Sequence, residues 1–185
     1  MGQPKAGVPW NGGTLLDQAV RQGRAAGGSV SVVVGAGYPR ARFRCRVQPQ
    51  RWVVNPHWQQ GLSTSLRCGL RCVDARAAGV IIMLVDQPAI PDSFFRTLGE
   101  QARQRPRQII AARRADGGWS VPVYWPRSWF GVLRQLRGDQ GGRQLLVGQD
   151  VVGVACPEAA WDVDTPQAWR ALISQTDRQA RQPPE

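Results

Sequence analysis

The 185-residue sequence is 42% hydrophobic and 20% charged, which supplies enough apolar material for one domain with a buried core. No apolar run reaches the roughly 18 residues of a membrane span, and no basic stretch followed by an apolar one marks a signal peptide. The net charge of +11 indicates an anionic partner such as nucleic acid, a membrane surface or a phosphorylated small molecule.

Helical and extended patterns alternate along the chain, which is typical of a three-layer α/β domain with a mostly parallel central sheet. We expect residues 1–178 to form one domain and residues 179–185 to be a disordered tail. The expected elements, in chain order, are a helix capped by Thr14, strands at 29–35 and 51–55, a helix at 58–73, a strand at 79–86, a helix from Pro91, extended segments at 107–113 and 117–125, a helix at 126–137, a strand at 151–156 and a helix after Pro166.

Two segments carry more specific expectations. GVIIMLVD (79–86) is apolar without interruption, so we expect it to be a central strand, buried on both faces. RARFRCRV (40–47) alternates arginine with less polar residues, and this period of two predicts a strand with one arginine face. That face is either a charged edge that resists aggregation or a binding surface.

The cysteines and tryptophans are expected to be structural. The four cysteines contain no CxxC pair, and Cys68 and Cys72 share a helix face as buried thiols would, so we expect reduced cysteines and a cytoplasmic protein. The eight tryptophans fall among the predicted elements at core spacing. This spacing argues against a stacking platform for bases, and hence against nucleic acid as the anionic partner.

Candidate chemistry lies where strands end. Asp86 ends the apolar strand, and Asp164 precedes the last helix; taken alone, each is a helix cap or a turn residue. Together at one edge of a sheet, two carboxylates suit Mg²⁺. The segment GLSTSL (61–66) adds hydroxyls and backbone donors, whereas His57 has no nucleophile partner that would make a triad.

Lys5 is the only lysine beside 23 arginines. One interpretation is a compositional preference for arginine that left one lysine by chance. The other is that this position requires a compact ammonium on a flexible stem rather than a planar guanidinium.

Five motifs together resemble one family. They are MGQPK (1–5), NPHWQQGLSTSLRCGL (55–70), LVDQP (84–88), GDQGGRQLL (138–146) and DVDTP (162–166). In this order and spacing the chain resembles the molybdenum cofactor cytidylyltransferases, within the molybdopterin nucleotidyltransferases. The resemblance implies a three-layer Rossmann-like nucleotidyltransferase fold. It also implies Mg²⁺-dependent transfer of CMP from CTP to a molybdopterin-type cofactor, with release of pyrophosphate.

The resemblance also implies roles for particular residues. Lys5, Asp86 and Asp164 would be catalytic, with the two aspartates holding Mg²⁺. Asp139 and Arg143 would face the molybdopterin-type cofactor. The nucleotide would be bound by Gly2, Lys5, Asn55, Gly61, Ser63 and Ser65. A molybdoenzyme of the xanthine dehydrogenase type would be a partner.

The chain departs from the family pattern at two places. The family motif is a strand followed by LAAGxSxRMGxxK, and this chain begins at its MG, so we expect the natural start to lie upstream and Met1 to be internal. Without that strand, two strand edges and an apolar slot would be exposed. The family commonly has Gly-His-Pro where this chain has Ser120-Val121-Pro122, which affects contacts on the cofactor side.

Three other functions remain open at this point. The chain could be a related nucleotidyltransferase that uses GTP or another acceptor. It could be a catalytically impaired paralogue that binds or matures molybdoenzymes. Nucleic-acid binding by charge alone is the third.

Overall fold

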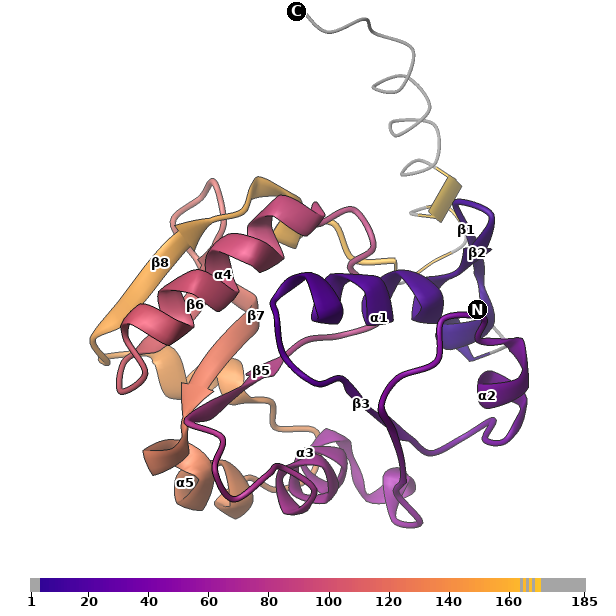
Figure 1. Ribbon diagram of the computed structural model, residues 1–185, viewed down its shortest axis with the longest axis horizontal. Helices are drawn as coiled ribbons and strands as arrows, with labels where there is room; N and C mark the ends of the chain where they lie inside the picture. The colour runs from indigo at the N-terminus through magenta and orange to yellow at the C-terminus, as the bar shows by residue number, and fades with distance from the viewer. Residues whose placement is uncertain (1–3, 164, 166, 168, 171–185) are drawn as a thin grey trace, which may run out of the picture.

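Helices flank a sheet that is divided into two parts, and an antiparallel pair of short strands within residues 9–14 forms a third, separate sheet (Figure 1). The structure is a computed structural model and describes residues 4–163, 165, 167, 169 and 170. The strands are β1 (Pro9–Trp10), β2 (Gly13–Thr14), β3 (Ser31–Val34), β4 (Arg51–Val54), β5 (Gly79–Ile82), β6 (Ile109–Arg113), β7 (Trp119–Pro126) and β8 (Val151–Ala155). The helices are α1 (Leu15–Ala25), α2 (Arg40–Arg44), α3 (Leu62–Arg71), α4 (Asp92–Gln104) and α5 (Phe130–Gln135). Short 3₁₀ turns lie at Lys5–Gly7, Trp58–Gln60, Arg127–Trp129, Gly142–Leu146 and Pro157–Ala160.

The larger part of the sheet has four strands in the order β5-β7-β6-β8. The strand β7 runs antiparallel to both β5 and β6, whereas β6 and β8 are parallel. The smaller part is the parallel pair β3–β4. The sheet is therefore mixed, with both parallel and antiparallel pairs.

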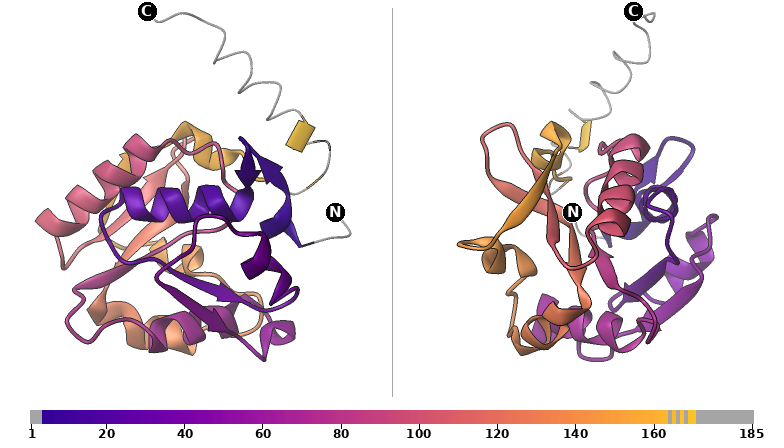
Figure 2. Two further views of the ribbon diagram at one scale, coloured as in Figure 1. Left: turned by 45° about the vertical axis from the view of Figure 1, so that its right-hand side comes forward. Right: turned by 60° about the vertical axis from the view of Figure 1, so that its left-hand side comes forward.

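Each face of the four-stranded part is covered by helices, which gives the three layers. On one face α4 packs through Phe95 and Leu98 against Ile110, and α1 lies beside α4 (Figures 1 and 2). On the other face Leu70 of α3 and Leu133 of α5 join a second cluster that includes Trp125. Successive residues of β6 are buried toward opposite faces, as expected for a strand between two helical layers. The expected three-layer α/β architecture is confirmed.

The start of α1 forms as its sequence predicts. Thr14 accepts a hydrogen bond from the backbone N–H of Asp17, and the Asp17 carboxylate accepts one from the backbone N–H of Thr14, which completes a capping box. The Asp17 carboxylate is fully buried and also accepts the N–H groups of Arg46 and Val47, each at 2.7 Å. A single carboxylate thus ties the segment after α2 to the first turn of α1.

The strand expected at 40–47 is wrong, because residues 40–44 form the helix α2. Arg40, Arg42 and Phe43 are all exposed, Phe43 by 84%, so the alternating pattern does not mark a buried and an exposed face. No strand pairs with this segment among the described residues, and Asp17 instead accepts the N–H groups of Arg46 and Val47. A strand requires a neighbouring strand, and the alternation of side chains in one segment does not show whether such a neighbour is present.

The central position expected for residues 79–86 is also wrong. Only Gly79–Ile82 are extended, and β5 lies at an end of the four-stranded order with β7 on one side. All four residues of β5 are half-buried, although its apolar sequence suits burial on both faces. Among the described residues no strand joins the free edge of β5 to β3, so the sheet remains in two parts.

The four cysteines are free thiols, as expected for a reduced protein. Burial and the adjacent Asp17 carboxylate together raise the pKa of the Cys45 thiol to about 11. Burial likewise raises the pKa of Cys156 to about 12. Both thiols are therefore protonated and unreactive near neutral pH.

None of the helices in the part of the chain that the structure describes is long and apolar enough to cross a membrane. The expected tail at 179–185 and most of the helix expected after Pro166 lie outside the described residues.

Candidate functional site

Lys5 and Asp86 form an ion pair at the carboxyl end of β5. The Lys5 Nζ donates to Asp86 Oδ2 at 2.8 Å across 81 residues of sequence. Lys5 lies in the 3₁₀ turn that follows Pro4, and Asp86 lies in the loop that leads from β5 to α4. The side chain of Asp86 is 16% exposed and that of Lys5 is 31% exposed, so the pair is reachable from solvent.

The second carboxylate oxygen of Asp86 is a candidate ligand for a cation. Asp86 Oδ1 is buried and accepts no hydrogen bond from the described residues. A buried anionic oxygen without a donor is costly unless a cation or a ligand completes it. Such an oxygen fits a hard divalent cation, so the residue suits the predicted metal-binding role. Asp164 and Gly2 lie outside the described residues.

The segment that leads to Asp164 is fixed beside Asp86. The backbone N–H of Val163 donates to the backbone oxygen of Asp86 at 2.8 Å. Gln87 Nε2 donates to Asp162 Oδ1 at 2.9 Å and to the backbone oxygen of Ala159 at 3.2 Å. The chain is thus fixed beside Asp86 as far as Val163, the residue that precedes Asp164. Among the described residues no three His, Cys, Asp or Glu side chains gather as a metal cluster.

Two buried glutamines support the Asp86 loop, and no role was predicted for either of them. Gln22 of α1 is 1% exposed and its Nε2 donates to the backbone oxygen of Ile90 at 2.8 Å. Gln87 is 3% exposed and makes the bonds described above. Their roles depend on contacts between residues more than 60 positions apart. The motif LVDQP includes Gln87 but does not show these contacts, and Gln22 lies in none of the five motifs.

A second group of predicted residues lies after β4. Asn55 is 1% exposed, and its Nδ2 donates to Thr64 Oγ1 at 2.8 Å and to Ser65 Oγ at 3.0 Å. Its Oδ1 accepts the backbone N–H of His57 at 3.0 Å. Asn55 therefore shapes the loop between β4 and α3 with polar atoms that are already bonded within the protein. Ser63 is fully buried, and its Oγ has no partner among the described residues.

The start of α3 meets the GDQGGR segment. Gly61 has φ +103°, and a Cβ there would lie 2.3 Å from the backbone carbon of Gly138. The N–H of Ser63 donates to the backbone oxygen of Gly138 at 3.0 Å, and Asp139 Oδ1 accepts the N–H of Leu62 at 3.3 Å. Asp139 thus bonds the first turn of α3, a role that the sequence did not indicate. Arg143 is exposed.

The structure therefore assembles the predicted residues in two groups. Lys5 and Asp86 form the first; the second contains Asn55, Gly61, Ser63, Ser65 and Asp139. Ser120, at the position where the chain departs from Gly-His-Pro, is 5% exposed and donates to the backbone oxygen of Ala159 at 3.1 Å. In this chain Ser120 thus supports the turn that precedes the DVD segment.

Comparison with known proteins gives relatives over most of the chain. Nicotine blue oxidoreductase of Paenarthrobacter nicotinovorans is 32% identical, over 92% of this chain and 88% of that protein. A probable molybdenum cofactor guanylyltransferase of Opitutus terrae is 28% identical, over 80% of this chain and 71% of that protein. The chain spans only 66% of purine catabolism protein PucB of Bacillus subtilis (26% identity). It spans 47% of the bifunctional IPC transferase and DIPP synthase of Rubrobacter xylanophilus (29% identity).

Solved structures share the fold. Rv0371c from Mycobacterium tuberculosis H37Rv superposes with a TM-score of 0.79 at 27% identity, over 94% of this chain and 90% of that one. The same protein in complex with manganese gives a TM-score of 0.76 at 28% identity, over 92% and 91% of the two chains. The family model of the MobA-like NTP transferase domain matches residues 1–152. The chain therefore belongs to the MobA-like NTP transferase family, a family of nucleotidyltransferases.

Proposed function

We propose that this chain transfers CMP from CTP to the phosphate of a molybdopterin-type cofactor, with Mg²⁺ and with release of pyrophosphate. The observation that carries the proposal is the Lys5–Asp86 pair, whose buried Asp86 Oδ1 has no donor among the described residues. The guanylyltransferase relative supports a molybdenum cofactor as the acceptor, and the manganese complex of Rv0371c supports a divalent cation.

The reaction needs positioning and charge stabilisation more than proton transfer. A phosphate oxygen of the acceptor attacks the α-phosphorus of the nucleotide, and the bond to the bridging oxygen breaks so that pyrophosphate leaves with the electron pair. Because the attacking oxygen is already anionic, no strong general base is required. The Lys5 ammonium would donate to the triphosphate where negative charge builds. Asp86 and Asp164 would hold the divalent cation, which supplies further charge neutralisation.

The other predicted residues enter the proposal with revised roles. We propose that Gly2, Gly61, Ser63 and Ser65 lie along the nucleotide. Asn55 would act by holding this loop, because its amide already bonds Thr64 and Ser65. On the acceptor side, Arg143 is exposed and suits a phosphate contact, whereas Asp139 would act through the first turn of α3.

The test is pyrophosphate release with each of the four nucleoside triphosphates. The assay compares reactions with and without molybdopterin-type acceptor, in Mg²⁺, Mn²⁺ or EDTA. Where the gene continues upstream of Met1, the longer product is assayed in parallel. We expect release with CTP that requires both acceptor and divalent cation. Equal inactivity with all four nucleotides would contradict the proposal.

Two alternatives have distinct outcomes in the same assay. Faster release with GTP would identify a guanylyltransferase, the activity named for the relative from Opitutus terrae. Nucleotide binding without release would identify a catalytically impaired paralogue. The second alternative is favoured by the Ser120-Val121-Pro122 sequence, which stands where the family commonly has Gly-His-Pro.

The cellular setting follows from the proposed reaction. We propose a cytoplasmic protein whose product is delivered to a molybdoenzyme of the xanthine dehydrogenase type. Co-purification of the chain with such an enzyme would test this delivery.

A further inference from the structure

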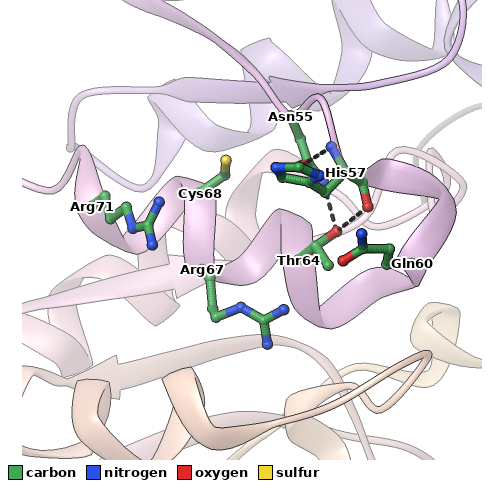
Figure 3. Close-up of a pocket in the computed structure, with 7 residues that line it drawn as sticks. All are labelled: Asn55, His57, Gln60, Thr64, Arg67, Cys68 and Arg71. Atoms are coloured by element: carbon green, nitrogen blue, oxygen red, sulfur yellow. Dashed lines mark hydrogen bonds between the residues drawn. The ribbon is translucent and has the colours of Figure 1, made fainter.

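A shallow pocket of about 90 Å³ lies between the β4–α3 loop and α3 (Figure 3). The loop contributes Asn55, His57 and Gln60, and the helix contributes Thr64, Arg67, Cys68 and Arg71. Pockets that hold drug-sized ligands measure about 300–1,000 Å³, so this volume suits a small polyatomic group rather than a whole nucleotide.

Helical spacing explains why two arginines line the same pocket. Residues 64, 67, 68 and 71 follow the i, i+3, i+4, i+7 pattern, which places them on one face of α3. Leu66 and Leu70 lie on another face and pack in the core beneath the sheet. The amphipathic sequence of α3 thus directs Arg67 and Arg71 to the pocket side.

The β4–α3 loop is joined to Thr64 by a closed set of hydrogen bonds, drawn as dashed lines in Figure 3. Asn55 Nδ2 donates to Thr64 Oγ1 at 2.8 Å, and Thr64 Oγ1 donates to the backbone oxygen of His57 at 3.0 Å. The backbone N–H of His57 donates back to Asn55 Oδ1 at 3.0 Å. The loop therefore has a fixed shape beside the arginine face of the helix.

The positive charge of the pocket is not balanced by the described residues. None of the lining residues is a carboxylate. Arg67 Nη1 donates to the backbone oxygen of Leu136 at 2.6 Å, which fixes the guanidinium without neutralising it. The guanidinium of Arg71 makes no hydrogen bond or ion pair with the residues that the structure describes. Two like charges four residues apart weakly destabilise a helix, and an anion bound beside them would relieve this repulsion.

We propose that this pocket binds an oxyanion, specifically the phosphate group of a phosphorylated ligand. Arg67 and Arg71 supply the charge and the planar arrays of donors that match phosphate oxygens. Gln60 and His57 lie at the rim of the pocket (Figure 3). The site goes beyond the proposed function, because neither arginine has a role in the transfer reaction.

Inorganic phosphate is the probe for this site. The ¹⁵N-labelled chain is titrated with phosphate at constant ionic strength, in EDTA and without nucleotide, and backbone amide shifts are followed. We expect concentration-dependent shifts that are largest in residues 67–71, beyond the residues proposed to lie along the nucleotide. Shifts confined to residues 61–65 and the surroundings of Lys5 and Asp86, or no saturable shift at all, would overturn the proposal.

Substitutions give an independent readout. Arg71→Gln should weaken phosphate binding by about tenfold, which is the loss expected for one charge-assisted hydrogen bond. Arg96→Gln on α4 makes the same change of charge at another exposed position and should leave the affinity unchanged. Lys5→Gln should also leave it unchanged, which separates this site from the nucleotide site. Equal affinities for Arg71→Gln and Arg96→Gln would overturn the proposal.

Discussion

Replacing Gly61 by alanine should separate the two loops that meet at the start of α3. Gly61 has φ +103° and ψ 171°, a region open essentially to glycine alone, so alanine costs about 1–3 kcal/mol in backbone strain. Its Cβ would lie 2.3 Å and 2.4 Å from the backbone carbon and oxygen of Gly138, and backbone atoms cannot rotate away. Displacement would also break the hydrogen bonds made by the N–H groups of Leu62 and Ser63, about 1 kcal/mol each.

Gly138→Ala is the matched control for this substitution. Gly138 also has a positive φ of +53°, but a Cβ there would meet nothing within 4 Å, so only about 1 kcal/mol of strain is expected. Urea unfolding should show a loss of about 3–5 kcal/mol for Gly61→Ala against about 1 kcal/mol for Gly138→Ala. In a chain of this size these losses lower Tm by about 10 °C and about 3 °C. Equal losses for the two variants would refute the close approach of the two loops.

Two further substitutions test the buried polar groups around the site. Burial raises the pKa of Asp17. The hydrogen bonds that its carboxylate accepts, of which that from the Val47 N–H has the largest effect, lower the pKa by more, so the net pKa lies below the ordinary value. The stability that Asp17 supplies is therefore present above about pH 4 and lost as the pH falls through the lowered pKa. Asp17→Asn should cost about 2 kcal/mol at pH 7, and urea unfolding should show this cost shrinking toward pH 2; a constant cost would contradict the assignment. Gln87→Leu should cost about 1 kcal/mol and speed hydrogen exchange at the Val163 amide, whereas unchanged exchange would show that Gln87 does not hold this segment.

The layers of the fold were accessible from the sequence because each depends on a local pattern. The cap at Thr14 uses residues three apart, and the apolar run of β6 follows from its burial between helices. The strand expected at 40–47 failed for a physical reason. A strand needs a neighbour to accept its backbone hydrogen bonds, and the sequence of the segment itself cannot show whether one is present.

The position of β5 and the role of Asp139 show the same limit. The apolar sequence of β5 predicts a buried strand, but the place of β5 in the sheet depends on which strands lie beside it. Asp139 bonds the N–H of Leu62 across 77 residues of sequence. A motif identifies Asp139 as notable, whereas only the fold shows that it stabilises the first turn of α3.

The pair of Lys5 and Asp86 was predicted as two separate residues, and the structure joins them. The lone lysine of the chain thus meets the carboxylate at the end of its most apolar segment. Neither residue specifies the other by sequence, because 81 positions lie between them.

The most direct test of the account is the rate of Mg²⁺-dependent pyrophosphate release from CTP in Asp86→Asn. The amide keeps the shape of the side chain but removes the anionic oxygen that suits a cation. Asp150→Asn, at an exposed position near β8, is the matched control. We expect Asp86→Asn to lower the rate at least about a hundredfold, as for loss of a group that stabilises transition-state charge, and Asp150→Asn to stay within about twofold. An Asp86→Asn variant as active as Asp150→Asn would contradict the central claim.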